Sequence, residues 1–218
     1  MLLSKHSSNY ENGLESRNLT VSLMPRPAKF DRDTAIGNAV QLFWQRGFSA
    51  TSMKDLESAL NMRPGSIYAS FGSKEQLFGM ALESYAEVSL AKLADQIANE
   101  PSAIQALASY LRGMADEQAE IPPAQACMLV KTLLELGHQN SELGARAEAL
   151  LAQMESTFAT ILQRDGIPEA EAQRIASRLQ VGIMGLRSYF QRDISAAQKA
   201  ELANALADDL LYWAQAYR

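Results

Sequence analysis

The sequence contains few of the residues that build most catalytic and metal centres. Among its 218 residues are one cysteine, Cys127, and two histidines. A single cysteine excludes an intramolecular disulfide and fits a reducing compartment. Histidines and carboxylates do not cluster at metal-ligand spacing, and no glycine-rich loop suits a phosphate. We therefore expect a protein that is not an enzyme and has no catalytic residues, no metal and no cofactor.

Long hydrophobic runs are missing as well. No apolar stretch approaches the length of a membrane span, and residues 1–13, MLLSKHSSNYENG, lack the apolar core of a signal peptide. These absences predict a soluble, cytoplasmic protein that contacts no membrane. β-branched residues are sparse, while alanine and leucine dominate a chain that is 47% hydrophobic. That composition favours an all-α fold.

Apolar residues recur at helical spacing in about nine segments, with breaks at Pro101, Pro122 and Gly166. The expected helices span about residues 31–46, 52–60, 64–71, 74–98, 102–117, 124–136, 141–164 and 168–192, with a ninth after residue 195. Two serines, each followed three residues later by an acidic or amide side chain, predict capping boxes at Ser52 and Ser195. We expect three N-terminal helices followed by a larger helical domain.

The segment Thr51–Glu75, TSMKDLESALNMRPGSIYASFGSKE, is the most informative. It predicts two short helices joined by a tight corner, with a third helix starting directly afterwards. Asn61 tolerates the left-handed backbone that a sharp corner needs, and Pro64 suits a first helical turn. Helix, corner and short helix form the shape that lays a second helix into the major groove of DNA.

The residues from Asn61 to Glu75 resemble the signature of the TetR family of bacterial transcriptional regulators, G-V-S-x-G-S-I/L-Y-x-H-F-x-S-K-E. The matching residues are Gly65, Ser66, Ile67, Tyr68, Phe71, Ser73, Lys74 and Glu75. Three positions depart from it: Asn61 replaces a glycine, Arg63 a serine or threonine, and Ser70 a histidine. The resemblance extends upstream through the run Phe43–Phe48 and covers roughly residues 24–90.

This resemblance implies a ligand-responsive repressor that binds a palindromic operator in double-stranded DNA as a homodimer and is released by a small molecule. It divides the chain after residue 23 into a DNA-binding domain of residues 24–77 and a ligand-sensing and dimerisation domain of residues 78–218. Residues 1–23 are polar and lack periodicity, so we expect them to form a disordered tail. Met24 is either the true initiator or follows a dispensable tail. A transcriptional activator of the same family and a helical adaptor that binds no DNA are the alternatives.

The predicted DNA-contacting residues lie on or beside the two short helices. They are Thr51, Ser52, Arg63, Pro64, Ser66, Tyr68 and Lys74. Arginine commonly reads guanine, so Arg63 is a candidate base reader, with a phosphate contact or a solvated cation as the alternative. Tyr68 and Lys74 match family positions that hold the DNA backbone, although Tyr68 also suits a partly buried core position.

Charge is distributed unevenly along the chain. Residues 24–77 carry seven cations and five anions, a net charge of +2, whereas residues 78–218 carry eleven cations and eighteen anions, a net charge of −7. A locally positive domain can hold phosphates while the acidic remainder limits nonspecific adhesion. Ordinary scatter of charge explains a value of +2 equally well.

The last two expected helices share a continuous apolar stripe. In the family the corresponding helices pair with their copies, so the predicted dimer interface consists of Ile175, Leu179, Ile183, Leu186, Phe190, Leu202, Leu206, Leu210 and Trp213. Packing within one chain is the alternative explanation of the same stripe.

The resemblance also implies a pocket for a small molecule among the later helices. The candidate residues are Tyr85, Tyr110, Met114, Gln118, Met128, Met154, Phe158 and Arg187. Methionine and aromatic side chains at helical spacing are also ordinary core residues. Cys127 lies in an apolar run, which favours an inert buried thiol over a redox sensor.

Overall fold

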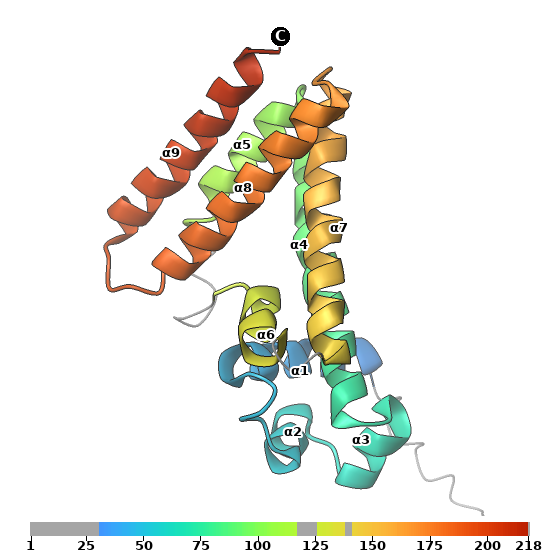
Figure 1. The fold of residues 1–218 in the computed structure, drawn as a ribbon. Coiled ribbons are helices and arrows are strands. Elements are labelled where there is room, and N and C mark those ends of the chain that lie inside the picture. The colour runs from blue at the N-terminus through green and yellow to red at the C-terminus, as the bar shows by residue number, and fades with distance from the viewer. Residues whose placement is uncertain (1–30, 117–125, 138–140, 218) are drawn as a thin grey trace, which may run out of the picture. The chain divides into compact units, whose positions relative to one another are not determined.

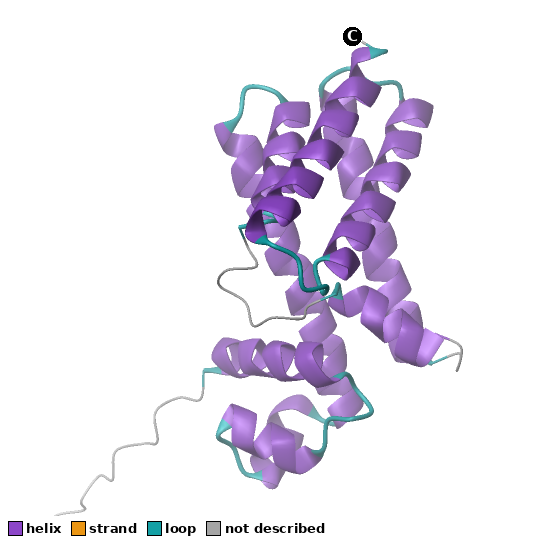
Figure 2. Ribbon diagram, turned by 90° about the vertical axis from the view of Figure 1, so that its left-hand side faces the viewer, coloured by secondary structure: helices purple, strands orange, loops and turns teal. Residues whose placement is uncertain are grey.

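The computed structural model describes residues 31–116, 126–137 and 141–217, and within these ranges the regular structure is entirely helical (Figures 1 and 2). The helices are α1 (Arg32–Arg46), α2 (Met53–Leu60), α3 (Pro64–Phe71), α4 (Lys74–Asn99), α5 (Ala103–Gly113), α6 (Met128–Leu136), α7 (Glu142–Arg164), α8 (Glu169–Tyr189) and α9 (Ala196–Gln215). The prediction of an all-α fold is confirmed. No helix in the described ranges is long and apolar enough to cross a membrane.

Helices α1 to α3 pack around the beginning of α4. Their core holds Phe43, Ile67 and Phe78, each no more than 1% exposed, and the rings of Phe43 and Phe78 meet edge to face at 4.8 Å. This core continues into residues of α6 and α7, among them Leu129 and Ala147. The three N-terminal helices therefore share their interior with the helices that follow.

Helix α4 spans the predicted domain division at residue 77. It contacts α1 and α3 near its beginning, and α5 and α7 also pack against it. Helix α7 runs beside α4 and packs against α8, while α9 packs against both α5 and α8 (Figure 1). A second core forms among these helices around Leu107, Phe158 and Leu179.

Most of the apolar stripe of α8 and α9 faces this second core, which corrects the predicted dimer interface at five of its nine residues and leaves the other four as a prediction. Ile175, Leu179, Ile183, Phe190 and Leu210 are buried within the chain itself. The half-buried Leu186, Leu206 and Trp213 pack against the same core, and Leu202 is exposed. A helix lying between two neighbours needs its apolar face for its own chain. The face of α8 and α9 that is open to solvent instead carries Val181 and Tyr212, which are 69% and 73% exposed.

Two charged side chains of α6 hold the end of α1. The Glu135 carboxylate accepts hydrogen bonds from the backbone N–H groups of Phe48 and Ser49, at 3.1 and 2.6 Å, and the Lys131 ammonium donates to the Trp44 carbonyl. Gly47 permits the approach, because its φ is +83° and a Cβ there would lie 2.7 Å from the Glu135 Oε2 atom. We call these contacts the α6–α1 tie.

Ionisation of Glu135 follows from this arrangement. Partial burial raises the pKa of Glu135, but the hydrogen bonds from Ser49 and Phe48 outweigh burial and bring the pKa below its ordinary value of 4.5. Burial lowers the pKa of Lys131, and the charge of Glu135 opposes that effect. Because its pKa is lowered, Glu135 is ionised at neutral pH, as the tie requires.

We expect Glu135→Gln to lower the free energy of unfolding by about 1–2 kcal/mol, because hydrogen bonds to a charged acceptor are replaced by weaker ones. The carboxylate has a lowered pKa in the folded state, so its contribution is complete above pH 4.5 and is lost as pH falls through that lowered pKa. Urea denaturation at several pH values measures both effects. Glu148→Gln, at an exposed site on α7, is the control, and an equal loss there would contradict the role of the tie.

Candidate functional site

Helices α2 and α3 form a tightly fixed pair. Ser52 caps α2: its hydroxyl accepts from the Asp55 N–H at 3.2 Å, and the Asp55 carboxylate accepts from the Ser52 N–H at 2.9 Å, which confirms the expected capping box. Asn61 ends α2 in the left-handed conformation with φ of 51°, as expected for the corner. Pro64 occupies the first turn of α3. The local sequence thus sets the angle at which α3 leaves α2.

Helix α3 is anchored by two side chains and otherwise exposed. Ile67 and Phe71 are 1% and 2% exposed, whereas Tyr68 is 51% exposed. The other exposed residues of α3 are Pro64, Gly65, Ser66, Ala69 and Ser70. A Cβ at Gly65 would meet no atom within 4 Å, so folding of the chain gives no reason for a glycine there. Apart from its two anchors, α3 is an open surface.

Lys74 lies at the start of α4, beside this surface. Ser73 caps α4 through a capping box with Gln76, and the Lys74 ammonium lies 4.3 Å from the centroid of the Phe48 ring. The ring fixes the position of the ammonium group near the first turn of the helix, where free N–H groups attract anions. This arrangement suits a phosphate.

Among the remaining predicted DNA contacts, some side chains are exposed and could reach DNA, whereas one is buried. Arg63 and Ser52 are exposed, and Arg63 makes no capping hydrogen bond. Thr51 is 1% exposed, and its hydroxyl donates to the Gly47 carbonyl at 2.7 Å. The prediction of a phosphate contact from Thr51 is therefore corrected, because its side chain closes the turn after α1.

One cation of the region is used internally. Arg46 pairs with Asp55 at 2.6 Å. Hydrogen bonds from Ser52, with a smaller effect of Arg46, lower the pKa of Asp55. The pair joins the end of α1 to the first turn of α2. Because Arg46 is occupied in this pair, fewer cations of the N-terminal domain are available to DNA phosphates than the sequence count suggests.

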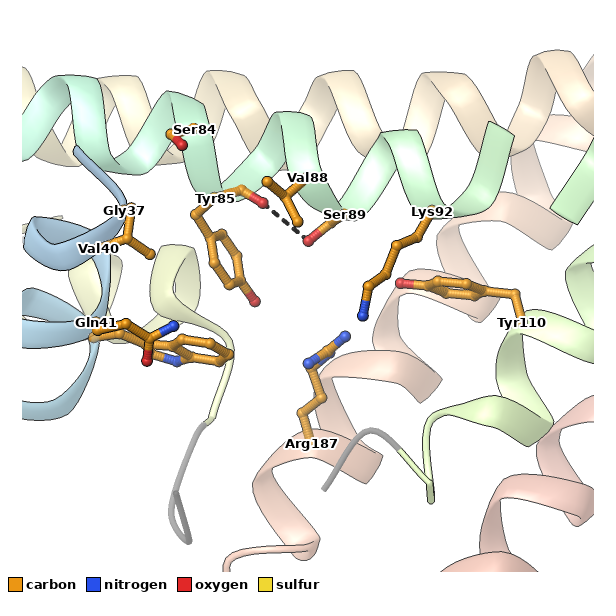
Figure 3. Close-up of a pocket in the computed structure, with 11 residues that line it drawn as sticks. Gly37, Val40, Gln41, Ser84, Tyr85, Val88, Ser89, Lys92, Tyr110 and Arg187 are labelled. Carbon is orange, nitrogen blue, oxygen red and sulfur yellow. Dashed lines mark hydrogen bonds between the residues drawn. The ribbon is translucent and has the colours of Figure 1, made fainter. Parts of the chain in front are cut away.

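A cavity of about 210 Å³ lies between α1, α4, α5 and α8 (Figure 3). Its lining residues are Gly37, Val40, Gln41, Trp44, Ser84, Tyr85, Val88, Ser89, Lys92, Tyr110 and Arg187. A smaller cavity of about 20 Å³ adjoins it, with Tyr85, Ser89, Tyr110 and Arg187 as shared walls. Its further walls include Cys127, Met154, Phe158 and Gln180.

The predicted ligand residues are only partly brought together. Tyr85, Tyr110 and Arg187 line the main cavity, and Met154 and Phe158 line the smaller one. Met114 and Met128 are core residues outside both cavities, and Gln118 lies outside the described residues. Sequence reasoning missed Trp44, Lys92 and Gln180. The sequence does single out Lys92, because no other lysine or arginine lies between Lys74 and Arg112.

Tyr85 links the two cavities. Burial is the main cause that raises the pKa of its phenol well above the ordinary value, and Cys127 and Tyr110 act in the same direction, while the charge of Arg187 opposes them. The phenol is thus protonated at neutral pH and can donate a hydrogen bond. Its ring also meets that of Trp44 edge to face at 5.1 Å.

An exposed short helix after a fixed corner, followed by a larger set of helices, is the arrangement of a helix-turn-helix DNA-binding regulator. A profile of bacterial regulatory proteins of the tetR family matches residues 36–81, and one of the LmrA/YxaF-like transcriptional regulator C-terminal domain matches residues 103–188. The chain is 30% identical over 183 residues to the HTH-type transcriptional repressor ComR of Escherichia coli (strain K12), covering 81% of this chain and 84% of that protein.

Solved structures of TetR family regulators are also similar to this chain. A cysteine mutant of the TetR family transcriptional regulator CifR, complexed with 26bp double-strand operator DNA, matches with a TM-score of 0.68 and 27% identity over 84% of this chain and 98% of that one. A TetR family regulator from Cytophaga hutchinsonii shares the fold, with a TM-score of 0.72 at 21% identity over 83% of this chain and 93% of that one. The chain belongs to the TetR family of bacterial transcriptional regulators, a family of regulators and not of enzymes.

The open space at Gly65 generates a prediction. Gly65→Ala should leave the free energy of unfolding unchanged or raise it by about 0.5–1 kcal/mol, because alanine is the better helix former. The same change should weaken binding to duplex DNA, because a methyl group enters the space that the DNA backbone would occupy. Thermal unfolding and fluorescence anisotropy measure the two effects. Gly113→Ala, also in open space, should leave DNA affinity unchanged; unchanged affinity in Gly65→Ala would contradict the close approach.

Proposed function

We propose that this protein represses transcription by binding a palindromic operator as a homodimer and that a small molecule releases it. The observation that carries the proposal is the exposed α3, held by Ile67 and Phe71 and flanked by Arg63 and Lys74. The repressor ComR and the operator complex of CifR, both similar to this chain, support it. A regulator of bacterial genes acts where the chromosome lies, so we propose a cytoplasmic location.

A dimer would contact more base pairs than a single copy of α3 can reach. Helix α3 has eight residues, and a helix of that length meets only a few base pairs, whereas a two-fold dimer doubles the contacts on a palindrome. The solvent-facing side of α8 and α9 supports such an interface, because Val181 and Tyr212 expose apolar surface there. Gly185 has open space around its Cα, which would let a partner helix approach closely.

Release requires that a ligand favour one arrangement of the reading helices over another. The main cavity suits this role because α1 contributes Trp44 and Gln41 to its wall while α8 contributes Arg187. A ligand there would touch the DNA-binding helices and the sensing domain together. We propose that it changes the position of α1 relative to α8 and so the spacing of the two copies of α3.

Selection of genomic fragments by the purified protein, followed by sequencing, tests the function. We expect an enriched palindrome bound in a salt-dependent manner. Lys74→Ala should weaken binding to every sequence and reduce the slope of log affinity against log salt by about 1 per site. Arg63→Ala should cost about 1–3 kcal/mol on the operator and relax specificity at one base pair. A folded protein that enriches no palindrome would overturn the proposal, and equal losses on random and operator DNA would refute base reading by Arg63.

Introducing a charged side chain on the outer face of α8 tests whether this face forms the dimer interface. Val181→Glu should weaken the dimer by tenfold or more, about 1.4 kcal/mol, because a carboxylate would be buried between two apolar faces. Sedimentation equilibrium measures the dissociation constant. Leu134→Glu changes an equally exposed leucine on α6 and should leave the dimer intact. An unchanged dimer in Val181→Glu would place the interface elsewhere.

A further inference from the structure

Helix α7 holds the first half of α4 through the side chain of one arginine. We propose that Arg146 is a positioning residue for DNA binding: it fixes α4 against α7 and so sets the place of Lys74 at the start of α4. This inference rests on the proposed DNA-binding function and names a residue that serves it without touching DNA.

The Arg146 guanidinium contacts α4 at two residues that are one turn apart. Its Nε atom donates to the Glu83 Oε1 atom at 3.0 Å, and its Nη2 atom donates to the same oxygen. Its Nη1 atom lies at Gly79, where a Cβ would be only 2.5 Å away. Gly79 and Glu83 are four residues apart and therefore lie on one face of the helix. The guanidinium thus packs on the backbone of α4 and binds a carboxylate on its next turn.

This contact accounts for a glycine inside a long helix. Glycine is a poor helix former, yet Gly79 lies within α4, which runs without a break from Lys74 to Asn99. The three atoms nearest to a Cβ at this position all belong to Arg146, and the third of them is already at 3.6 Å. Only the arginine side chain therefore stands in the way of a methyl group.

The contact between Arg146 and Glu83 sets position more than it adds stability. The two side chains are 38% and 42% exposed, and exposed ion pairs add little to the free energy of unfolding, because solvent screens them. Two nitrogens of a planar group meet one oxygen, and the third packs on the helix backbone at Gly79. Such a rigid group restricts how far α4 can rotate or slide along α7.

The contact lies near the DNA-binding end of α4. Gly79 follows Lys74 by five residues, which is about 8 Å along the helix axis. The neighbouring Phe78 and Leu82 belong to the core that the N-terminal helices share with α6 and α7. A shift of α4 at Gly79 would therefore move the Lys74 ammonium relative to α3.

Helix α7 is itself fixed where it begins. The Ser141 hydroxyl accepts from the Gly144 N–H at 3.0 Å and donates to the Leu136 carbonyl of α6 at 3.1 Å. Helix α6 in turn holds the end of α1 through the α6–α1 tie. Arg146 extends this set of contacts to α4. Since α2 and α3 lie between α1 and α4 in the chain, both ends of the helix-turn-helix are held from the start of α7.

Fluorescence anisotropy with the full chain and the selected operator, at several salt concentrations, tests the role. Arg146→Ala should weaken operator binding by about three- to tenfold, because the loss of a coupling contact misplaces Lys74. The slope of log affinity against log salt should keep its wild-type value, because no phosphate contact is removed. Arg146→Lys keeps a cation beside Glu83 and should lose less affinity. Arg164→Ala removes an exposed arginine from the last turn of the same helix and should bind as the wild type does.

Gly79→Ala tests the geometry of the contact. In the wild-type chain the new methyl group should displace the guanidinium and weaken operator binding, as Arg146→Ala does. In the Arg146→Ala chain the methyl group has room, so the double variant should lose no further affinity. Because alanine is the better helix former, Gly79→Ala should raise the urea midpoint of unfolding more in the Arg146→Ala chain than in the wild-type chain.

Wild-type affinity in both Arg146→Ala and Gly79→Ala would overturn the proposal, and so would losses that add in the double variant. A smaller salt slope in Arg146→Ala would make this residue a phosphate contact and would overturn it as well. If Arg146→Ala does not fold, Arg146→Lys and Gly79→Ala decide the outcome by the same affinity and slope. Absence of operator binding in the wild type would refute the proposed function, whereas an operator bound equally by wild type and variants would refute this inference alone.

Discussion

The α6–α1 tie is the contact on which the position of the reading helices depends. Glu135 and Lys131 bind the backbone where α1 ends, and Arg46 and Asp55 join that same end to the start of α2. Backbone groups at a helix end otherwise lack partners. Because α6 satisfies them here, a displacement of α6 reaches the turn that orients α2 and α3.

Trp44 belongs to this connection and to the cavity together. Its indole N–H donates to the Ala126 carbonyl at 2.8 Å, just before α6, and its ring meets Tyr85 and lines the cavity. The cavity and the helix that precedes the helix-turn-helix therefore share one buried side chain. Packed cores change between discrete arrangements more readily than they deform continuously. A ligand bound beside the Trp44 ring, as proposed, would therefore affect both the cavity and the contact with the residues before α6.

Features set by neighbouring residues were predictable from the sequence. The capping boxes at Ser52 and Ser195 and the corner at Asn61 form as expected, because each depends on a few adjacent residues. The direction of the stripe on α8 and α9 was not predictable: a helix repeats its apolar residues in the same way whether its neighbour belongs to its own chain or to a copy. The resemblance implied a pocket, but most of its walls escaped prediction because they come from four helices far apart in sequence. The isolation of Lys92 in the sequence marks that residue without showing what it faces.

Gly182 brings α8 and α9 so close that a Cβ there would lie 2.6 Å from a methyl group of Leu206. A larger residue at position 182 would require the Leu206 side chain to change its conformation or α9 to move away from α8. In a dimer built on the outer face of these helices, two-fold symmetry would apply that displacement twice and carry it to both copies of α3. In the proposed dimer, the close packing at Gly182 would thus help to set the distance between the two operator half-sites.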